Sequence, residues 1–144
     1  MLSNTSKYAI RAMIYLAMNA GNSQKTGIKK ISSELSIPAP FLAKILQILA
    51  RHKLLSSSKG PNGGFSLSRD ARKIMLFEIV TVIDGSDIFD KCLISLRTCN
   101  EENIPCPIHH KYEGIRNEIK QLFQQQDIGN LANDIKAQQK IYAL

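Results

Sequence analysis

The chain has 144 residues, of which 44% are hydrophobic and 22% charged, and its formal net charge is +7. This length and composition exclude an intrinsically disordered chain and predict one globular domain, or a small domain with an appended element. No apolar run approaches the roughly 18 residues of a membrane span, so we expect a soluble protein with no membrane partner. Three cysteines and only a weak match to a signal peptide favour a reducing compartment, and the cytoplasm is the expected location.

Positive charge is concentrated in the first half of the chain. Residues 1–75 carry 12 Lys and Arg against 2 Asp and Glu, a net charge of +10, whereas residues 76–144 carry 7 against 10, a net charge of −3. A basic surface neutralises phosphates and releases counterions, which dominates the affinity of proteins for nucleic acids. A solvated cationic surface, or one attracted to anionic membranes, would show the same composition. The charge distribution therefore favours a nucleic-acid partner without excluding these alternatives.

The spacing of apolar residues before residue 53 predicts three helices, each with one apolar face. Asn4, Thr5 or Ser6 is expected to cap the first of them. Pro40 suits the start of the third, because a proline in the first helical turn costs no hydrogen bond. The predicted ranges are Lys7–Ala20, Thr26–Leu35 and Pro40–His52.

Two short strands are predicted directly after the third helix, over Leu54–Ser58 and Phe65–Ser68. Between them, the glycines and the proline of residues 59–64 supply the backbone conformations of a hairpin turn. Three helices followed by a hairpin with a basic tip predict a winged helix-turn-helix. In that fold the third helix enters the major groove, and the wing reaches the neighbouring backbone or minor groove. The expected fold class is mainly α, with a two-stranded wing.

The rest of the chain contains further helical patterns around an irregular segment. A fourth helix is predicted over Leu76–Ile83, packed on the first three, and others over Tyr112–Gln126 and around Ile128–Ile135. A long amphipathic helix that projects beyond a small domain needs a cover, for which we expect a second subunit. The expected division is a DNA-binding domain over 1–85, a cysteine-rich loop over 86–110 and a helical dimerisation region over 111–144.

The irregular segment contains Cys92, Cys99 and Cys106, followed closely by His109. Thiolates and imidazoles bind zinc and iron–sulfur clusters. Structural zinc sites usually use close Cys-x-x-Cys pairs, and because this segment has none, an iron–sulfur cluster is favoured over zinc. Cysteines without a metal, acting as thiol switches or as small buried hydrophobes, are the remaining alternatives.

A cysteine nucleophile with a histidine base is the enzymatic alternative for this segment. Three equivalent thiols in a loop, without a nucleophile elbow or a phosphate-binding loop elsewhere in the chain, argue against it. We therefore expect a protein that is not an enzyme and has no small-molecule substrate.

Four segments carry a resemblance to a known family: Lys7–Met13, Ile37–Leu46, Lys59–Phe65 and Cys106–His109. Together they resemble the Rrf2 family of bacterial winged-helix transcription regulators, over nearly the whole chain. The resemblance implies a homodimer, joined through the long helix from about Tyr112, that binds a palindromic operator in double-stranded DNA. It also implies that the loop holds an iron–sulfur cluster, a [2Fe–2S] centre in IscR-like members, and that DNA binding responds to cluster, redox or nitrosative state.

Specific residues are expected at both sites. Lys44 or Gln47, on the outward side of the third helix, is expected to reach base edges and Arg51 a phosphate, while Lys59 enters the minor groove. The full set of expected DNA-binding residues is Lys7, Tyr8, Pro40, Phe41, Lys44, Gln47, Arg51, Lys59, Gly60, Asn62 and Gly63. The expected cluster ligands are Cys92, Cys99, Cys106 and His109, with His110 as the alternative histidine.

Overall fold

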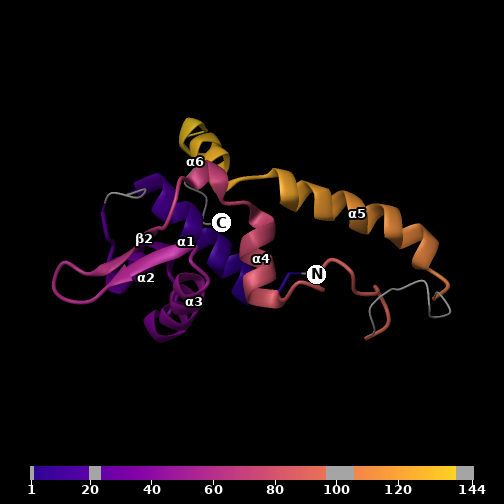
Figure 1. Ribbon diagram of the computed structural model, residues 1–144, viewed down its shortest axis with the longest axis horizontal. Coiled ribbons are helices and arrows are strands. Elements are labelled where there is room, and N and C mark those ends of the chain that lie inside the picture. Colours follow the sequence, from indigo (N-terminus) through magenta and orange to yellow (C-terminus); the bar gives the residue numbers. More distant parts are fainter. Residues whose placement is uncertain (1, 20–23, 97–105, 139–144) are drawn as a thin grey trace.

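The computed structural model describes residues 2–19, 24–96 and 106–138. Its elements are α1 (Asn4–Asn19), α2 (Ile28–Leu35), α3 (Ala39–Arg51), β1 (Leu55–Ser58), β2 (Gly64–Leu67), the 3-10 helix η1 (Ala71–Lys73), α4 (Leu76–Asp84), α5 (His109–Gln125) and α6 (Ile128–Ala137). The predicted mainly helical fold with a two-stranded wing is confirmed. Figure 1 shows the wing, α2 and α3 at one end and α5 extending toward the other. In these described ranges, no helix is both long and apolar enough to cross a membrane.

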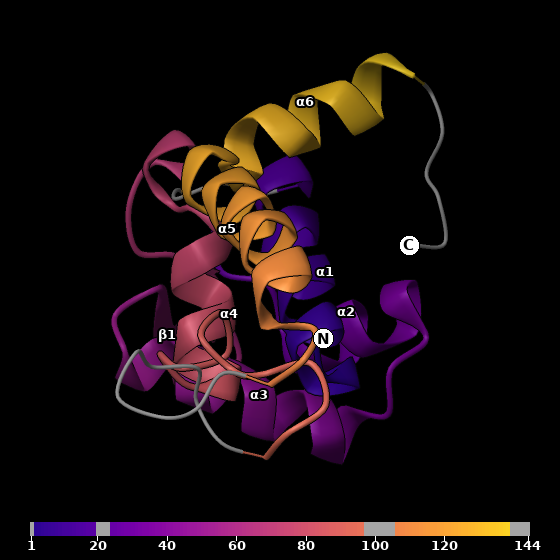
Figure 2. The same ribbon diagram turned by 90° about the vertical axis from the view of Figure 1, so that its right-hand side faces the viewer.

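One apolar core joins the helices of the winged domain to α6. Its fully buried side chains include Met13, Leu16, Ile31, Leu42, Ile45, Leu46, Leu49 and Ile79. Their spacing of three and four residues along α1 and α3 places each set on one helical face. Ile128 and Ala132 of α6 belong to the same core, and Figure 2 shows α6 lying across α1. Part of the region predicted to serve dimerisation thus completes the core of the DNA-binding domain.

The wing strands pair antiparallel, with Leu55 opposite Leu67 and Ser58 opposite Gly64. Thr26 forms an isolated antiparallel bridge with Phe65 of β2. The Thr26 N–H donates to the Phe65 carbonyl at 2.8 Å, and the Thr26 carbonyl accepts from the Phe65 N–H at 2.9 Å. The predicted start of the second helix at Thr26 is therefore wrong, and α2 begins at Ile28. Local apolar periodicity carries no information about a pairing between segments so distant in the chain.

The junction between α5 and α6 is fastened to the chain that precedes α4. The Leu76 N–H donates to the Gln126 carbonyl at 2.9 Å, and the Ile128 N–H donates to the Ile74 carbonyl at 3.0 Å. The Asp127 carboxylate caps α6 by accepting the Asn130 N–H at 2.7 Å. The C-terminal end of α5 is thereby anchored to the core, while its first turn lies at the far end of the molecule (Figure 1).

The apolar stripe of α5 is packed against the protein on one side and exposed on the other. α5 begins at His109, earlier than the predicted Tyr112. Phe123 packs against Phe89, with ring centroids 5.3 Å apart, and Phe89 in turn stacks on Phe77 of α4. Ile115 and Leu122, by contrast, are 56% and 57% exposed. The described chain thus covers only one side of the stripe that the sequence predicts as a single face.

Asp84, the last residue of α4, binds the start of α1. Its carboxylate accepts hydrogen bonds from the Ser3 N–H at 3.1 Å, the Ser3 hydroxyl at 2.5 Å and the Ser6 hydroxyl at 2.8 Å. Ser3 Oγ also accepts the Ser6 N–H at 3.0 Å, so Ser3 is the capping residue rather than Asn4, Thr5 or Ser6. Partial burial raises the pKa of the Asp84 carboxyl, but these hydrogen bonds outweigh it, so that the pKa lies below its ordinary value of 3.8.

We expect Asp84→Asn to lower the free energy of unfolding by about 2 kcal/mol at neutral pH, because hydrogen bonds to a charged acceptor are lost at a helix N-terminus. Since the folded-state pKa is lowered, the stabilisation is present above the unfolded-state value and disappears as the pH falls through the folded-state pKa. Urea unfolding at pH 7 and at about pH 3 measures both effects. The matched control is Asp87→Asn, which removes only a surface ion pair to Lys91 at 3.7 Å. An equal loss in both variants would contradict the assignment.

Candidate nucleic-acid interface and cysteine site

The third helix presents one buried and one polar face. Leu42, Ile45 and Leu49 lie in the core, and Lys44, Gln47 and Arg51 are exposed on α3. The spacing of three and four residues places these three polar side chains along one line of the helix surface. Pro40 lies in the first turn and is also exposed. The structure therefore presents to solvent the α3 side chains that the sequence predicts for DNA contact.

Two of the expected DNA-binding residues pack against each other. The rings of Tyr8 and Phe41 meet edge to face with centroids 5.6 Å apart, which joins α1 to the start of α3. Arg11 lies over the Tyr8 ring at 5.7 Å and donates through Nη2 to the carbonyl of Leu35 at 3.0 Å. Tyr8 and Phe41 thus have a packing role that the motif alone does not reveal. Lys7, the residue directly before Tyr8, is exposed.

Arg11 is a residue that sequence reasoning missed. Its guanidinium reaches from α1 to the last residue of α2, immediately before the turn that leads into α3. The sequence feature that could have indicated its contact with Tyr8 was its position three residues later, on the same side of a helix. The contact fixes where α3 starts relative to α1.

The wing tip is a tight turn closed by a hydrogen bond from the Gly63 N–H to the Gly60 carbonyl at 2.9 Å. Gly60 has a φ of 101°, and a Cβ on Gly63 would lie 2.4 Å from the Ser58 carbonyl oxygen. Both glycines are therefore required by the shape of the turn. Lys59 and Asn62 carry the exposed side chains of the tip.

Further cations lie near these elements without having been predicted as contacts. Lys29 and Lys30, in the first turn of α2, are exposed, as is Lys53 after α3, while Lys25 is half-buried. The positive charge of residues 1–75 was their only signal in the sequence. These side chains extend the basic surface beyond α3 and the wing.

Two of the expected cluster ligands lie together. Cys92 Sγ and Cys106 Sγ are 3.3 Å apart although 14 residues separate them, and both residues are half-buried. This distance is longer than the roughly 2.05 Å of a disulfide bond. Cys99 lies outside the described residues. The fold therefore brings the first and third cysteines to one point beside the start of α5.

The two histidines lie in the first turn of α5. His109 Nε2 is 3.7 Å from a carboxylate oxygen of Glu113, and the rings of His109 and His110 lie edge to face with centroids 5.2 Å apart. One candidate ligand atom each from His109, His110 and Glu113 lie within 4.8 Å of one another. Within the described part of the chain, this compact set contains neither cysteine. His109 is thus near Cys106 in sequence, but the compact set of candidate ligand atoms that contains it is formed with His110 and Glu113 of α5.

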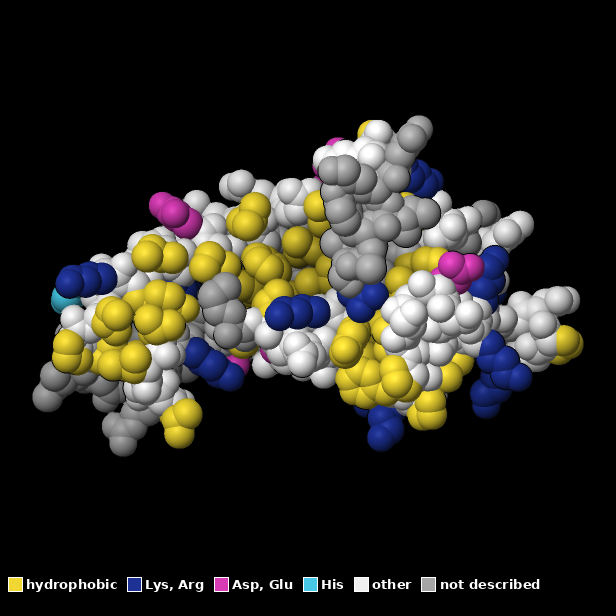
Figure 3. Space-filling model, turned by 180° about the vertical axis from the view of Figure 1, so that it is seen from behind, with side chains coloured by type: hydrophobic (Ala, Val, Ile, Leu, Met, Phe, Trp, Pro, Cys, Tyr) yellow, Lys and Arg dark blue, Asp and Glu magenta, His cyan; other side chains and the backbone are white. Residues whose placement is uncertain are grey.

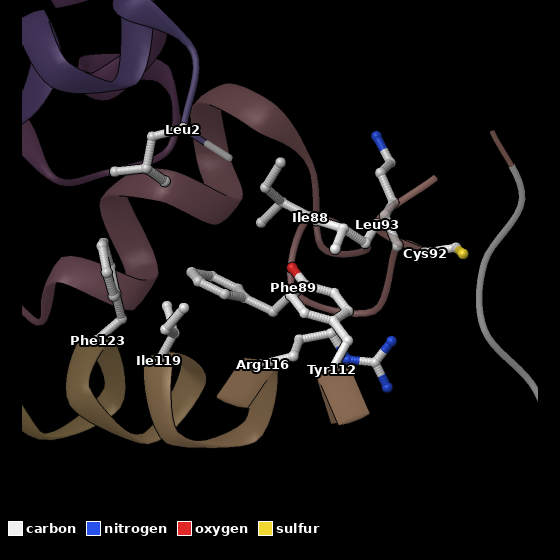
Figure 4. Close-up of a pocket in the computed structure, with 10 residues that line it drawn as sticks. Leu2, Ile88, Phe89, Cys92, Leu93, Tyr112, Arg116, Ile119 and Phe123 are labelled. Atoms are coloured by element: carbon white, nitrogen blue, oxygen red, sulfur yellow. The ribbon is translucent and has the colours of Figure 1, made fainter. Parts of the chain in front are cut away.

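A cavity of about 230 Å³ lies between α5 and the segment from Ile88 to Leu93 (Figure 4). Its walls are largely apolar and include Phe89 and Phe123. Cys92 lies at one edge of this cavity, and Arg116 of α5 enters it from the helix. Cys92 joins the cysteine pair to the cavity. The start of α5 lies at the end of the molecule opposite the wing (Figure 1).

Comparisons with known proteins agree with this architecture. The Rrf2 family model, described as an iron-dependent transcriptional regulator, matches residues 2–134. A protein of Aquifex aeolicus (strain VF5), whose name provisionally assigns it to the HTH-type transcriptional regulators, is 35% identical over 132 residues, which span 91% of this chain and 90% of that protein. The HTH-type transcriptional regulator IscR of Sodalis glossinidius is 30% identical over 91 residues, which span 63% of this chain and 54% of IscR.

Solved structures share the fold at lower identity. CymR, the global cysteine regulator of B. subtilis, superposes with a TM-score of 0.74 at 22% identity, covering 92% of this chain and 96% of CymR. IscR of T. potens superposes with a TM-score of 0.73 at 21% identity, covering 99% of this chain and 93% of the other. At these identities the likeness establishes the arrangement of helices and wing, including the long α5. The chemistry of the cysteine site is therefore inferred from the residues of this chain alone.

Proposed function

Because this chain belongs to the Rrf2 family of HTH transcriptional regulators, we propose that it binds a palindromic DNA operator as a homodimer and senses iron–sulfur cluster, redox or nitrosative state through its cysteines. Family membership confirms that the chain is a transcriptional regulator and not an enzyme. The observation that carries the finer proposal is the 3.3 Å approach of Cys92 and Cys106 at the end of a chain whose other end is basic. A regulator that binds the chromosome acts in the cytoplasm.

DNA recognition is assigned to α3 and the wing. Lys44 and Gln47 are exposed on α3 and long enough to reach base edges in the major groove, and Arg51 is placed to contact a phosphate. Lys59 at the wing tip supplies a cation to the adjacent minor groove. Tyr8, Phe41 and Arg11 hold α1, α2 and α3 in the relative positions that this docking needs.

Dimer formation is assigned to the side of α5 that the described chain leaves uncovered. Among the described residues, six large hydrophobic side chains are exposed, and five of them lie on α5 or directly after Cys92: Leu93, Ile94, Leu96, Ile115 and Leu122. Figure 3 shows apolar side chains gathered toward the end of the molecule where α5 begins. A two-fold symmetric dimer would bury this surface twice and place two α3 helices on a palindrome.

The cysteine pair has donors suited to an iron–sulfur cluster. Two thiolates bound to one tetrahedral metal at about 2.3 Å lie roughly 3.8 Å apart, close to the observed 3.3 Å. We assign Cys92, Cys99 and Cys106 as thiolate ligands and His109 as the fourth, with His110 as the alternative, for a [2Fe–2S] centre. When bound, the cluster would supply a redox-active or nitric-oxide-reactive group at this end of the chain.

The site also connects to the DNA-binding domain through this chain's own contacts. Cys92 follows α4 by eight residues, and Asp84 at the end of α4 binds the start of α1. Asp90 connects the same segment to α5, because its carbonyl accepts from Arg116 at 3.3 Å and its carboxylate pairs with Lys120 at 3.3 Å. A cluster that binds one arrangement of the segment after α4 more tightly than another favours that arrangement. The difference between the two binding free energies then sets how much operator affinity changes.

The second candidate is a thiol switch without a metal, favoured by the same 3.3 Å separation. Oxidation of the two thiols by a two-electron oxidant would form a Cys92–Cys106 disulfide with the release of two protons and two electrons. Zinc remains the third alternative for these ligands. The metal content of the protein distinguishes the three.

Lys59→Ala is expected to weaken operator binding several-fold and to lower the salt slope, log Kd against log salt concentration, by about 1.8, because each of the two protomers loses one cation from the DNA. The operator is first selected from random double-stranded DNA with the wild-type protein. The control is Lys136→Ala, which removes the same charge from exposed α6. A slope equal to that of the wild type would contradict the assignment of Lys59 to DNA.

The cluster proposal is tested on protein purified without oxygen, with its visible spectrum, iron and acid-labile sulfide measured on one sample. We expect visible absorption that is lost in Cys92→Ala and in Cys106→Ala and retained in Ser95→Ala. His109→Ala and His110→Ala identify the fourth ligand by which of them changes the spectrum. A colourless protein that stays metal-free after cluster reconstitution would overturn the cluster and leave the thiol switch.

A further inference from the structure

Arg116 of α5 is a buried cation without an ionic partner in the described structure. The residue is only 8% exposed, and its Nε atom has no hydrogen-bond partner. Nη1 donates to the backbone carbonyl of Asp90 at 3.3 Å, and the guanidinium lies 6.0 Å from the centroid of the Tyr112 ring. A buried guanidinium without a counter-charge is costly, because arginine keeps its proton. The site is therefore suited to an anion.

Two acidic residues near Arg116 have other partners. The Asp90 carboxylate lies 3.3 Å from Lys120 Nζ, and Glu113, on the preceding turn, lies 3.7 Å from His109. No ion pair is formed by Arg116 with any residue in ranges 2–19, 24–96 and 106–138. Among the described residues, no acidic side chain neutralises the Arg116 charge, so the guanidinium can pair with an anionic ligand while keeping its bond to Asp90.

The cavity beside Arg116 defines the rest of such a ligand. Apolar side chains form most of its wall, among them Ile88, Phe89, Ile119 and Phe123. The described lining residues include Lys91 and Arg116 but no acid. Figure 4 shows Arg116 extending alongside Tyr112, with its guanidinium on the Cys92 side of the view. Apolar walls with a cationic edge complement a molecule that has one apolar group and one negative group.

The cavity volume limits the size of the ligand. An apolar cavity of about 150 Å³ is sufficient for benzene, and this cavity measures about 230 Å³. The additional space accommodates one small acidic substituent. A carboxylate matches the planar fork of a guanidinium through two parallel hydrogen bonds.

We propose that this cavity is a binding site for a small apolar carboxylate of about the size of benzoate, with the carboxylate on Arg116 and the apolar group against Phe89 and Phe123. The occupant would join α5 to the segment that carries Cys92 and so act as an effector distinct from the cysteine ligands. The inference needs neither a cluster nor an operator.

The test is a calorimetric titration of the full-length, cluster-free protein with benzoate at pH 7. We expect saturable binding with a dissociation constant of about 10 mM or lower. Arg116→Gln is expected to weaken it at least about 10-fold, because a charge-assisted pair is lost. The matched control, Lys111→Gln, removes a positive charge from an exposed site on the same helix and should leave binding unchanged. Cys106→Ala, which changes a proposed cluster ligand outside the cavity lining, should also bind benzoate, which separates this site from the proposed cluster.

Three results would overturn the proposal: no saturable binding by the wild type, equal binding by Arg116→Gln, or equal affinity for benzoate and its neutral analogue benzamide. If Arg116→Gln does not fold, as judged by circular dichroism, Ile119→Phe replaces it. That variant keeps the cation but fills part of the cavity. Retention of benzoate binding in Ile119→Phe would place the ligand elsewhere and overturn the site.

Discussion

Gly64→Ala is expected to lower the free energy of unfolding by about 3 kcal/mol and to weaken operator binding by detaching the wing. Gly64 has a φ of 144°, and a Cβ there would lie 2.3 Å from the Thr26 carbonyl oxygen and 2.8 Å from the Gly27 nitrogen. Both neighbours are backbone atoms, which cannot rotate away as a side chain can. The two hydrogen bonds between Thr26 and Phe65 must then open, at about 1 kcal/mol each, in addition to the backbone strain.

Two other glycines provide matched controls in the same urea unfolding experiment. Gly60 has a φ of 101° with nothing within 4 Å of a Cβ, so Gly60→Ala carries only the backbone cost of about 1 kcal/mol. Gly114 lies in α5 with open space around it, and Gly114→Ala is expected to stabilise the protein by about 0.5–1 kcal/mol. If Gly64→Ala is no more destabilising than Gly60→Ala, the wing is not held through Thr26.

Replacing both Ile115 and Leu122 with glutamate is expected to raise the dissociation constant of the dimer at least about 100-fold. These residues lie two turns apart on one side of α5 and are more than half exposed. In a two-fold symmetric dimer each substitution acts twice, and each loses about 1.5–3 kcal/mol of apolar burial when the original side chain is fully covered. Affinity for the palindromic operator should fall with the dimer, because one protomer reaches only one half-site.

Analytical ultracentrifugation over a range of protein concentrations measures this change. Asn117→Glu combined with Gln124→Glu is the matched control, because it adds the same charge on the opposite side of α5 at exposed positions. The control should remain dimeric and bind operator like the wild type. A dimer that persists in the Ile115/Leu122 variant and dissociates in the control would move the interface to the other side of the helix.

The exposed and buried faces of the individual helices were predictable from the sequence. Lys44, Gln47 and Arg51 are separated from the apolar positions of α3 by helical geometry alone, so periodicity placed them correctly. The wing was predictable because residues 59–64 contain the glycines and proline that a hairpin turn requires. In each case the signal lies within a few residues of the feature that it predicts.

The cysteine site was predictable only as a set of residue types. Clustering in one segment identified Cys92 and Cys106 as candidate ligands, but their approach to 3.3 Å depends on how α4, the following segment and α5 pack. The first turn of α5 also orients His109 toward Glu113 and His110, which spacing along the chain does not indicate. A loop of irregular sequence has no period from which such distances can be derived.

By itself, the sequence determined the order of helices and wing, the basic half and the ligand types, because these follow from local propensity, periodicity and composition. The tertiary structure decided the pairing of Thr26 with Phe65, the burial of Ile128 beside α1 and the packed and exposed sides of the α5 stripe. It also placed Arg116 in a cavity without a counter-charge among the described residues. These features arise from contacts between segments far apart in the chain, whose energies depend on the packing of the whole fold and leave no pattern in the neighbouring residues.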